Sequence, residues 1–210
     1  MKKLFILLFL VPVLVLNAQE EESTEKTLFG GKDVRVTGYG APDLLFSQIL
    51  GNETGLFMGG RGGVILNSSL ILGGGGYGLA TKHTFDYKDP INGDSMNAYF
   101  NMGYGGLHIG YVNSSDDVVH YTLSTLIGAG GASYNDGAYY KPGSWEEGTL
   151  ESTAFFVLQP AVGIELNMLS FFRVEATVGY RLSLWSTLSH HGDTDLSGIF
   201  AGLALKFGKF

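Results

Sequence analysis

The sequence predicts an all-β protein: an eight-stranded antiparallel transmembrane up-and-down barrel preceded by a signal peptide. Three observations lead to this prediction. Apolar and polar residues alternate along most of the chain, charged residues keep to one face of each expected strand, and tight turns alternate with longer polar connections. Because successive side chains of a strand point to opposite faces, each such segment has one apolar face and one polar face.

The clearest alternation runs from Thr153 to Leu184, which we expect to be two strands joined by a turn at Asn167–Leu169. The second strand carries its apolar residues at even positions: Phe172, Val174, Ala176, Val178, Tyr180, Leu182 and Leu184. Its odd positions hold the charged, polar and small residues: Arg173, Glu175, Thr177, Gly179, Arg181 and Ser183. Since soluble sheets also alternate, this segment alone does not say which face is buried.

The N-terminus has the three parts of a secretory signal peptide. It begins with Met1-Lys2-Lys3, continues with an apolar stretch over 4–16, and offers Ala18 as a small residue for cleavage. The apolar stretch is too short for a transmembrane helix, although a retained membrane anchor is the alternative. We expect residues 1–18 to be the signal peptide, 19–32 a short flexible leader and 33–210 the barrel.

The composition excludes several classes of protein. There is no Cys, which removes disulfides, thiol catalysis, cysteine metal sites and a lipoprotein anchor. The formal charge of -7 becomes -9 when Lys2 and Lys3 leave with the signal peptide, and no basic stripe remains to bind nucleic acid. Glycine, at 32 of 210 residues, is about twice its usual share, without a collagen period.

The remaining chain divides into eight strand-like segments, which are 33–50, 54–66, 69–83, 96–112, 118–134, 151–166, 170–187 and 196–210. The tight connections between them are 67–68, 113–117 and 167–169, and the longer polar ones are 84–95, 135–148 and 188–195. Only the short connection at 51–53 departs from the alternation. Transmembrane barrels have this asymmetry, with short periplasmic turns and longer outer loops, so both termini are expected in the periplasm.

The other segments also keep their charges on one face. Arg61 lies opposite Met58 and Val64, and His120 lies opposite Tyr121. In 96–112 the apolar positions change from even to odd at Gly105-Gly106, which predicts a β-bulge. A soluble ligand-carrying barrel would have an apolar pocket and a polar exterior. We therefore expect the charged faces to line a polar lumen and the apolar faces to contact lipid.

The mature chain resembles the small eight-stranded outer-membrane β-barrel proteins of Gram-negative bacteria, of the OmpX-like kind. The signal peptide, the alternating strands and the C-terminal run Gly202–Phe210 carry the resemblance. It implies a location in the cell outer membrane, contact with membrane lipid and lipopolysaccharide, assembly by the barrel-assembly machinery, and no enzymatic activity or cofactor. Phe210 is out of phase with the apolar face of Phe207 and Leu205, so its role as an assembly signal stays open.

A charge network is expected in the lumen, from Arg35, Arg61, Glu165, Arg173, Glu175 and Arg181, with Lys206 as a further candidate. Opposite charges should pair there, because an unpaired charge in a narrow lumen is costly. The registers that keep both faces intact place Glu165 across from or diagonal to Arg173. We expect this network to plug the lumen; the alternative is an ion path or a proton site.

Two histidines, His108 and His120, should face inward on neighbouring strands and form a polar site. A metal would need more ligands than these two, so we expect no metal site. Ser124 shares a face with His120, but four strand residues separate them by about 13 Å, which is too far for a nucleophile and its base. We therefore expect no catalytic residue.

Glycine runs recur at 59–63, 73–76, 103–106 and 128–131, and they indicate strand curvature and close packing, or alternatively a wall that leaves a cavity for a hydrophobic ligand. One loop is acidic and aromatic, with Tyr139, Tyr140 and Trp145 as candidate contacts for an extracellular ligand. Two weaker candidate sites are the set of His190, His191, Asp193 and Asp195 and the cation-binding set of Asp86, Asp89 and Asp94.

These patterns favour a structural or surface-binding outer-membrane barrel with a plugged lumen. One alternative is a small pore or a conduit for hydrophobic solutes. The other is an outer-membrane lipid-modifying enzyme, which would need a Ser-His-acid set that the sequence does not provide.

Overall fold

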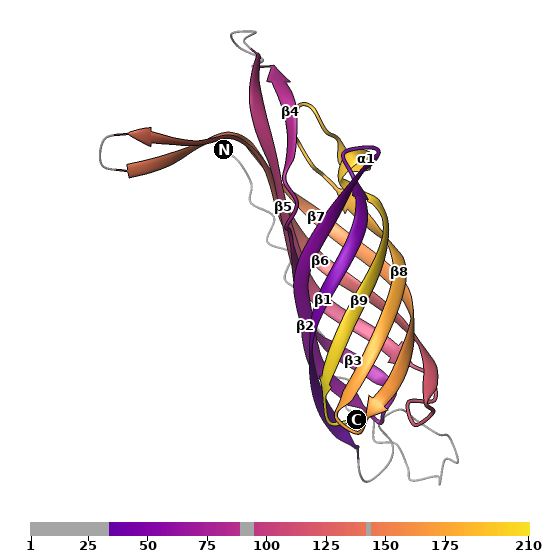
Figure 1. Cartoon of the computed structure of the whole chain (residues 1–210). Coiled ribbons are helices and arrows are strands. Elements are labelled where there is room, and N and C mark those ends of the chain that lie inside the picture. Colours follow the sequence, from indigo (N-terminus) through magenta and orange to yellow (C-terminus); the bar gives the residue numbers. More distant parts are fainter. Residues whose placement is uncertain (1–33, 89–94, 142–143) are drawn as a thin grey trace, which may run out of the picture. The chain divides into compact units, whose positions relative to one another are not determined.

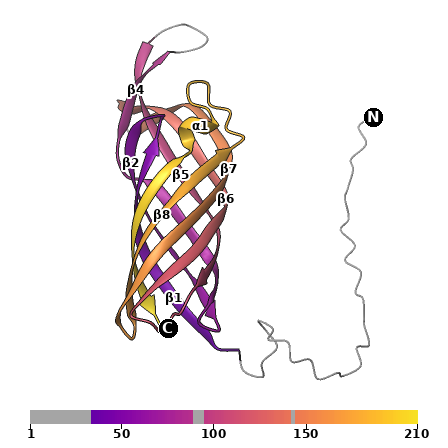
Figure 2. The same ribbon diagram turned by 90° about the vertical axis from the view of Figure 1, so that its right-hand side faces the viewer.

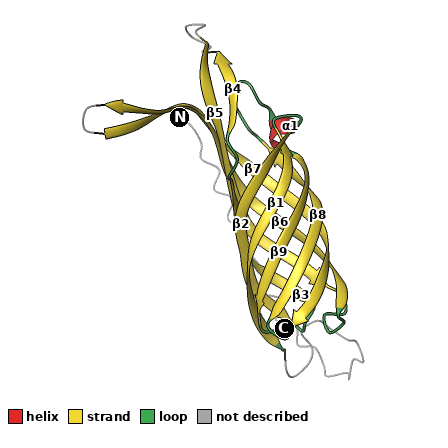
Figure 3. Cartoon of the chain, viewed as in Figure 1, coloured by secondary structure: helices red, strands yellow, loops and turns green. Residues whose placement is uncertain are grey.

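The structure is a computed structural model that describes residues 34–88, 95–141 and 144–210. The expected signal peptide (1–18) and leader (19–32) lie outside these residues. Nearly all of the described chain is strand, with one short helix (Figure 3). The elements are β1 (Val36–Ile49), β2 (Glu53–Leu66), β3 (Leu70–Leu79), β4 (His83–Lys88), β5 (Ser95–Val112), β6 (Val119–Lys141), β7 (Ser144–Leu169), β8 (Phe172–Leu184), α1 (Asp193–Leu196) and β9 (Gly198–Gly208).

Eight of these strands close into an antiparallel ring, in the order β3-β2-β1-β9-β8-β7-β6-β5, and β3 pairs with β5 to complete it. The remaining strand, β4, pairs only with the first part of β5 and extends the β3–β5 side beyond the ring (Figure 1). The predicted eight-stranded barrel is therefore confirmed. No helix among the described residues is long and apolar enough to cross a membrane.

The two ends of the barrel differ. The tight turns at 67–69, 113–118 and 170–171 lie at the end that also carries the C-terminus, which we call the turn end (Figure 2). The opposite end, the hairpin end, carries β4 and the outer parts of β5, β6 and β7 (Figure 1). The connection at 50–52 is a tight turn at the hairpin end, as its short sequence indicates.

Three expected connections differ from the structure. The described residues of the expected loops 84–95 and 135–148 belong to strands, with Thr84 opposite Tyr99 and Asn135 opposite Thr149. Two paired strands can hydrogen-bond their backbones to each other without an apolar face. A polar sequence can therefore form such a ribbon without the alternation by which strands are recognised. The turn expected at Asn167–Leu169 lies instead at 170–171, because β7 continues through Leu169 past a register irregularity.

The facing of the side chains follows the predicted alternation. On β8, Arg173, Glu175 and Arg181 are buried, whereas Val178 is 55% exposed on the outside. The neighbouring strand β7 exposes Ile164 in the same way. The charged faces therefore line the lumen, and a belt of large apolar side chains forms the exterior of the ring.

The bulge expected at Gly105-Gly106 is wrong. The β5–β6 register runs without a shift through Tyr104, Gly105, Gly106 and Leu107. The even residues Ala98, Phe100, Met102 and Tyr104 point inward and are buried, so the change of parity comes from the filling of the lumen, not from the backbone. The lumen is apolar and aromatic in its hairpin half, where Phe57, Phe100, Tyr104, Tyr134 and Phe155 belong to one buried cluster.

The glycine runs allow strand backbones to approach one another closely. A Cβ atom at Gly73 would lie 2.1 Å from the carbonyl oxygen of Gly62, and one at Gly128 would lie 2.0 Å from that of Gly105. Real Cβ atoms do not approach oxygen so closely, so these positions accept no side chain without movement of the wall. These contacts support the curvature interpretation over the cavity interpretation.

Replacing Gly128 with Ala should destabilise the barrel by about 1–3 kcal/mol, because the new methyl group overlaps a ladder backbone that cannot move freely. Gly40→Ala is the matched control, since a Cβ atom there has nothing within 4 Å. Urea titration of the detergent-folded variants, followed by the gel shift between unboiled and boiled samples, measures the difference. Equal unfolding midpoints for the two variants would contradict the close-approach role.

Candidate functional site: the charged lumen

Six charged side chains converge in the turn half of the lumen. They come from β1, β2, β7, β8 and β9 and are Asp43, Arg61, Glu165, Arg173, Glu175 and Lys206. All of them are buried, and each occupies an inward position of its strand. Strand alternation thus gathers in space charges that lie far apart in the sequence.

Glu175 is one of two carboxylates at the centre of this network. Its Oε2 atom accepts a hydrogen bond from Arg61 Nη2 at 2.7 Å and lies 2.8 Å from Lys206 Nζ. The hydroxyl of Thr122 donates to its other oxygen. Arg61 continues the network, because its Nε atom lies 3.0 Å from Asp43 Oδ2, which also accepts the hydroxyl of Tyr77 at 2.9 Å.

Glu165 is the second carboxylate, nearer the turn end. It accepts Arg173 Nη1 at 2.8 Å, and Lys206 Nζ donates to its other oxygen. Glu165 and Arg173 are thus paired, as the sequence indicated. The register places Glu165 opposite Glu175 and diagonal to Arg173, which is one of the two arrangements predicted.

The formal charges of the six residues cancel. Arg61, Arg173 and Lys206 supply three positive charges, and Asp43, Glu165 and Glu175 supply three negative ones. Lys206 contacts both glutamates and therefore joins the two halves of the network. Compensation on this scale is what a buried set of ions needs to be tolerated away from water.

Arg181 lies apart from this network, in the hairpin half. It is fully buried and donates to the carbonyl of Leu196 at 3.0 Å, the hydroxyl of Ser47 at 2.9 Å and the carbonyl of Gln48 at 3.1 Å. Its guanidinium group also lies 4.7 Å from the ring centroid of Phe57. Arg181 therefore ties β8 to β1 and α1 through carbonyls and an aromatic face, where sequence reasoning expected a carboxylate.

Arg35 also lies outside the lumen network. It is exposed at the turn end and donates from Nη2 to the carbonyl oxygen of Phe210 at 2.6 Å. The ring of Phe210 points inward, 3.9 Å from the guanidinium carbon of Arg173. Phe210 has the same parity as the inward residues Ala204 and Lys206 of β9, which agrees with the inward position of its ring. The residue covers the base of the lumen. The outward aromatic residue of β9 is Phe207, which stacks on Phe172.

The two histidines have different neighbours and do not contact each other in a metal-like pair. His108 lies 3.3 Å from the Tyr39 hydroxyl and 3.4 Å from Arg61 Nη1. His120 contacts Glu165 Oε1 at 3.0 Å and the carbonyl oxygen of Asp117 at 3.1 Å. Within the described residues no group of three or more His, Cys, Asp or Glu is arranged to hold a metal ion.

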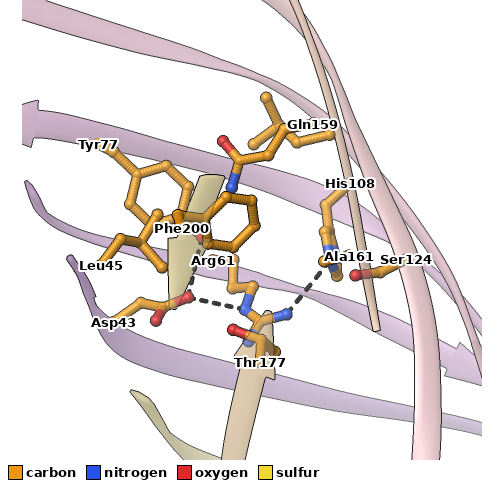
Figure 4. A pocket seen from close by; sticks show the side chains of 11 residues that line it. Asp43, Leu45, Arg61, Tyr77, His108, Ser124, Gln159, Ala161, Thr177 and Phe200 are labelled. Atoms are coloured by element: carbon orange, nitrogen blue, oxygen red, sulfur yellow. Dashed lines mark hydrogen bonds and ion pairs between the residues drawn. The ribbon is translucent and has the colours of Figure 1, made fainter. Parts of the chain in front are cut away.

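A cavity of about 10 Å³ lies at the boundary between the charged and aromatic halves (Figure 4). Asp43, Arg61, His108, Ser124 and Gln159 are among the residues that line it. The Oδ1 atom of Asp43 and the Oε1 atom of Gln159 have no hydrogen-bond partner in the protein. The volume suffices for one water molecule, and it is far too small for a lipid tail.

Sequence reasoning missed Asp43. This residue follows Ala41-Pro42, a turn-like context that conceals its inward position, although its odd number matches that of the buried Leu45 and Ser47. Strand parity was the signal that could have found it. Gln159 lies on the same face of its strand as Glu165, as the alternation predicts, and is buried there, but the sequence assigned it no role.

A second unpredicted cluster lies at the hairpin end. The Thr81 hydroxyl is 2.8 Å from His83 Nε2, and His83 Nδ1 contacts the carboxylate of Glu53. The order of these groups is that of a nucleophile, a base and an acid. However, Thr81 also accepts the backbone N–H of Leu56 at 3.1 Å, so the cluster clamps the β3–β4 connection to β2.

The loop candidates have structural contacts where they are described. Tyr134 and His191 Nδ1 share a hydrogen bond of 2.6 Å, and burial lowers the pKa of His191 from its ordinary value. The Asp193 carboxylate accepts the backbone N–H groups of Trp185 and Ser186. His190 lies 4.9 Å from Tyr87 between ring centroids. These contacts fold the β8–β9 connection over the aromatic half of the lumen.

Other loop candidates are described only in part. Tyr139 and Tyr140 belong to β6, and Trp145 belongs to β7, but their side chains lie outside what the structure describes. Asp86 is exposed on β4, whereas Asp89 and Asp94 lie outside the described residues.

Comparison with solved structures finds matches over most of the chain. Neisserial surface protein A is 15% identical, with 83% of this chain and 97% of that chain covered and a TM-score of 0.53. This chain has the fold of the small outer-membrane β-barrel proteins. Looser matches are Ail of Yersinia pestis (14% identity, 83% and 98% covered, TM-score 0.45) and the N-terminal barrel of Pseudomonas aeruginosa OprF (14%, 81% and 96%, 0.41). No family model and no curated protein matches the chain.

Removing the charge of Glu175 should destabilise this barrel by about 3–5 kcal/mol, because Glu175→Gln leaves Arg61 and Lys206 buried with too few partners. Asp116→Asn, which removes an exposed carboxylate in the 113–118 turn, is the matched control and should change stability little. Urea unfolding in detergent measures both. A Glu175→Gln variant as stable as the control would show that the network contributes nothing.

Proposed function

We propose that the protein is an integral outer-membrane barrel with a structural or surface-binding role, a sealed lumen and no enzymatic activity. The belt of exposed apolar side chains supports the membrane location. It includes Phe46 on β1, Leu107 on β5, Val178 on β8 and Ile199 on β9. A water-soluble protein would leave these residues without cover, whereas the hydrocarbon of a bilayer suits them.

The turn end is assigned to the periplasm and the hairpin end to the outside. Short turns at one end and long extensions at the other support this orientation. Arg35 and Phe210 are hydrogen-bonded at the turn end, so both ends of the described barrel lie on the same side. The predicted signal peptide supports the same assignment, since export delivers the chain to the periplasm. Assembly by the barrel-assembly machinery and contact with lipopolysaccharide belong to this proposal.

The filling of the lumen carries the proposal against a pore. The lumen is filled by three successive layers. Starting from the turn end, these are Phe210, the six charged side chains and the aromatic cluster. The cavity between the charges and the aromatic cluster is about 10 Å³, room for a single water. An eight-stranded ring is just wide enough for its own side chains, so conduction would require this packing to open.

A surface-binding role rests on the hairpin end. The β4–β5 hairpin and the outer parts of β6 and β7 extend past the ring, where they are available to a ligand outside the cell (Figure 1). Tyr139, Tyr140 and Trp145 on the β6–β7 extension are the proposed contacts. A lipid-modifying activity has less support, because neither His108 nor His120 hydrogen-bonds a serine among the described residues.

The purified barrel, reconstituted in a planar lipid bilayer, should carry no steady ohmic current, because its lumen is filled from end to end. The gel shift of an unboiled sample first establishes that the protein is folded. A boiled sample of the same preparation is the control for current from detergent or contaminants. A voltage-proportional current that rises with the amount of folded protein would overturn the sealed-lumen proposal in favour of the pore.

A further inference from the structure

The β7–β8 turn is apolar in a place where its counterparts are polar. Met168, Leu169 and Phe171 are 57%, 56% and 55% exposed, and the run Leu166–Phe172 contains no charged residue. Burial of a large apolar side chain away from water is favourable. Three such side chains left in water at one tight turn would therefore be unfavourable, which indicates that something covers them.

The other turns at this end have the opposite character. The β2–β3 turn consists of Asn67, Ser68 and Ser69, and the β5–β6 turn exposes Ser114 and Asp116. In the ring order, the β7–β8 connection lies across the barrel from the β2–β3 connection. The turn end is therefore asymmetric, with one apolar corner facing a polar one.

The apolar corner is continuous with the exterior belt. Leu166 and Ile164 on β7 are exposed directly above the turn. Beside them, Val118 at the end of the β5–β6 turn and Val119 at the start of β6 are also exposed, with Val118 at 71%. No break of polar residues separates the turn from the surface that is proposed to contact lipid.

Several polar groups beside this turn are hydrogen-bonded within the protein, although the Oδ1 atom of Asn167 has no partner among the described residues. The Asn167 N–H donates to the carbonyl of Val118 at 2.9 Å, and the carbonyl of Phe171 accepts the N–H of Gly208 at 3.0 Å. The side-chain amide of Asn167 donates to the carbonyls of Ser115 and Asp117. Hydrocarbon requires such internal satisfaction, because it offers no hydrogen bonds to a turn.

We propose that the β7–β8 turn, residues 168–171, inserts into the acyl-chain region of the periplasmic leaflet, so that this corner of the barrel sits deeper in lipid than the polar turns. Its partner is the acyl chains of membrane phospholipid. The inference rests on the proposed membrane location and orientation.

Fluorescence quenching by brominated lipid tests the depth of this corner. Trp145→Phe and Trp185→Phe remove both natural tryptophans, and single reporters are then introduced by Phe171→Trp, Met168→Trp, Val178→Trp or Asp116→Trp. Each full-length variant is folded into phosphatidylcholine vesicles with or without bromine on the upper part of the acyl chains. A gel shift establishes folding, and two reporters on the turn guard against failure of either one.

The Phe171→Trp and Met168→Trp variants should lose a share of their fluorescence comparable to that lost by the mid-belt Val178→Trp variant. The Asp116→Trp variant should lose little. Weak quenching at Val178→Trp would refute the membrane location itself. Strong quenching there, with both turn reporters as weak as Asp116→Trp, would leave the location intact and overturn the insertion, indicating a protein partner or a second copy on this corner. Equal strong quenching of all four would refute the asymmetry.

Discussion

The interior of this barrel depends on the shared use of Lys206 by Glu165 and Glu175. Each glutamate also has an arginine, so neither carboxylate relies on the lysine alone. What the lysine adds is neutrality, because two arginines cannot balance Asp43 and both glutamates. A barrel this narrow has no water-filled space in which a surplus charge could be hydrated. The placement of the charged strands around the ring follows from that requirement.

The lumen combines two kinds of filling that meet at a small polar cavity. In the turn half, the ion pairs set the orientation of the charged side chains, because each buried charge needs an opposite charge beside it. The aromatic half packs by shape. Among the described residues its buried arginine is Arg181, which is held by carbonyl groups and the ring of Phe57. His108 and Ser124 lie at this boundary and line the small cavity.

Strand alternation was sufficient to predict the ring, its strand number and the inward position of Arg61, Glu165, Arg173 and Glu175. It failed at Gly105-Gly106, because a change in what fills the lumen produces the same sequence pattern as a one-residue bulge. It placed the β7–β8 turn too early, because Asn167 is a residue that favours turns. The strand continues past it through Met168 and Leu169, which are apolar. The hydrogen bonds of Arg181 were beyond prediction, since they depend on carbonyls of segments more than a dozen residues away.

Lys206 lies on β9, the last strand of the chain, so the charge network includes the strand that pairs with β1. The ring closes only when β9 pairs with β1, for example through Tyr39 and Gly208. Until β9 docks, the remaining members of the network are two arginines and three carboxylates. Without β9, this network lacks one positive charge and the sheet has two unpaired strand edges. The strand that completes the ring thus also completes the charge network, and a bilayer, which offers no hydrogen bonds to a free strand edge, favours the closed barrel.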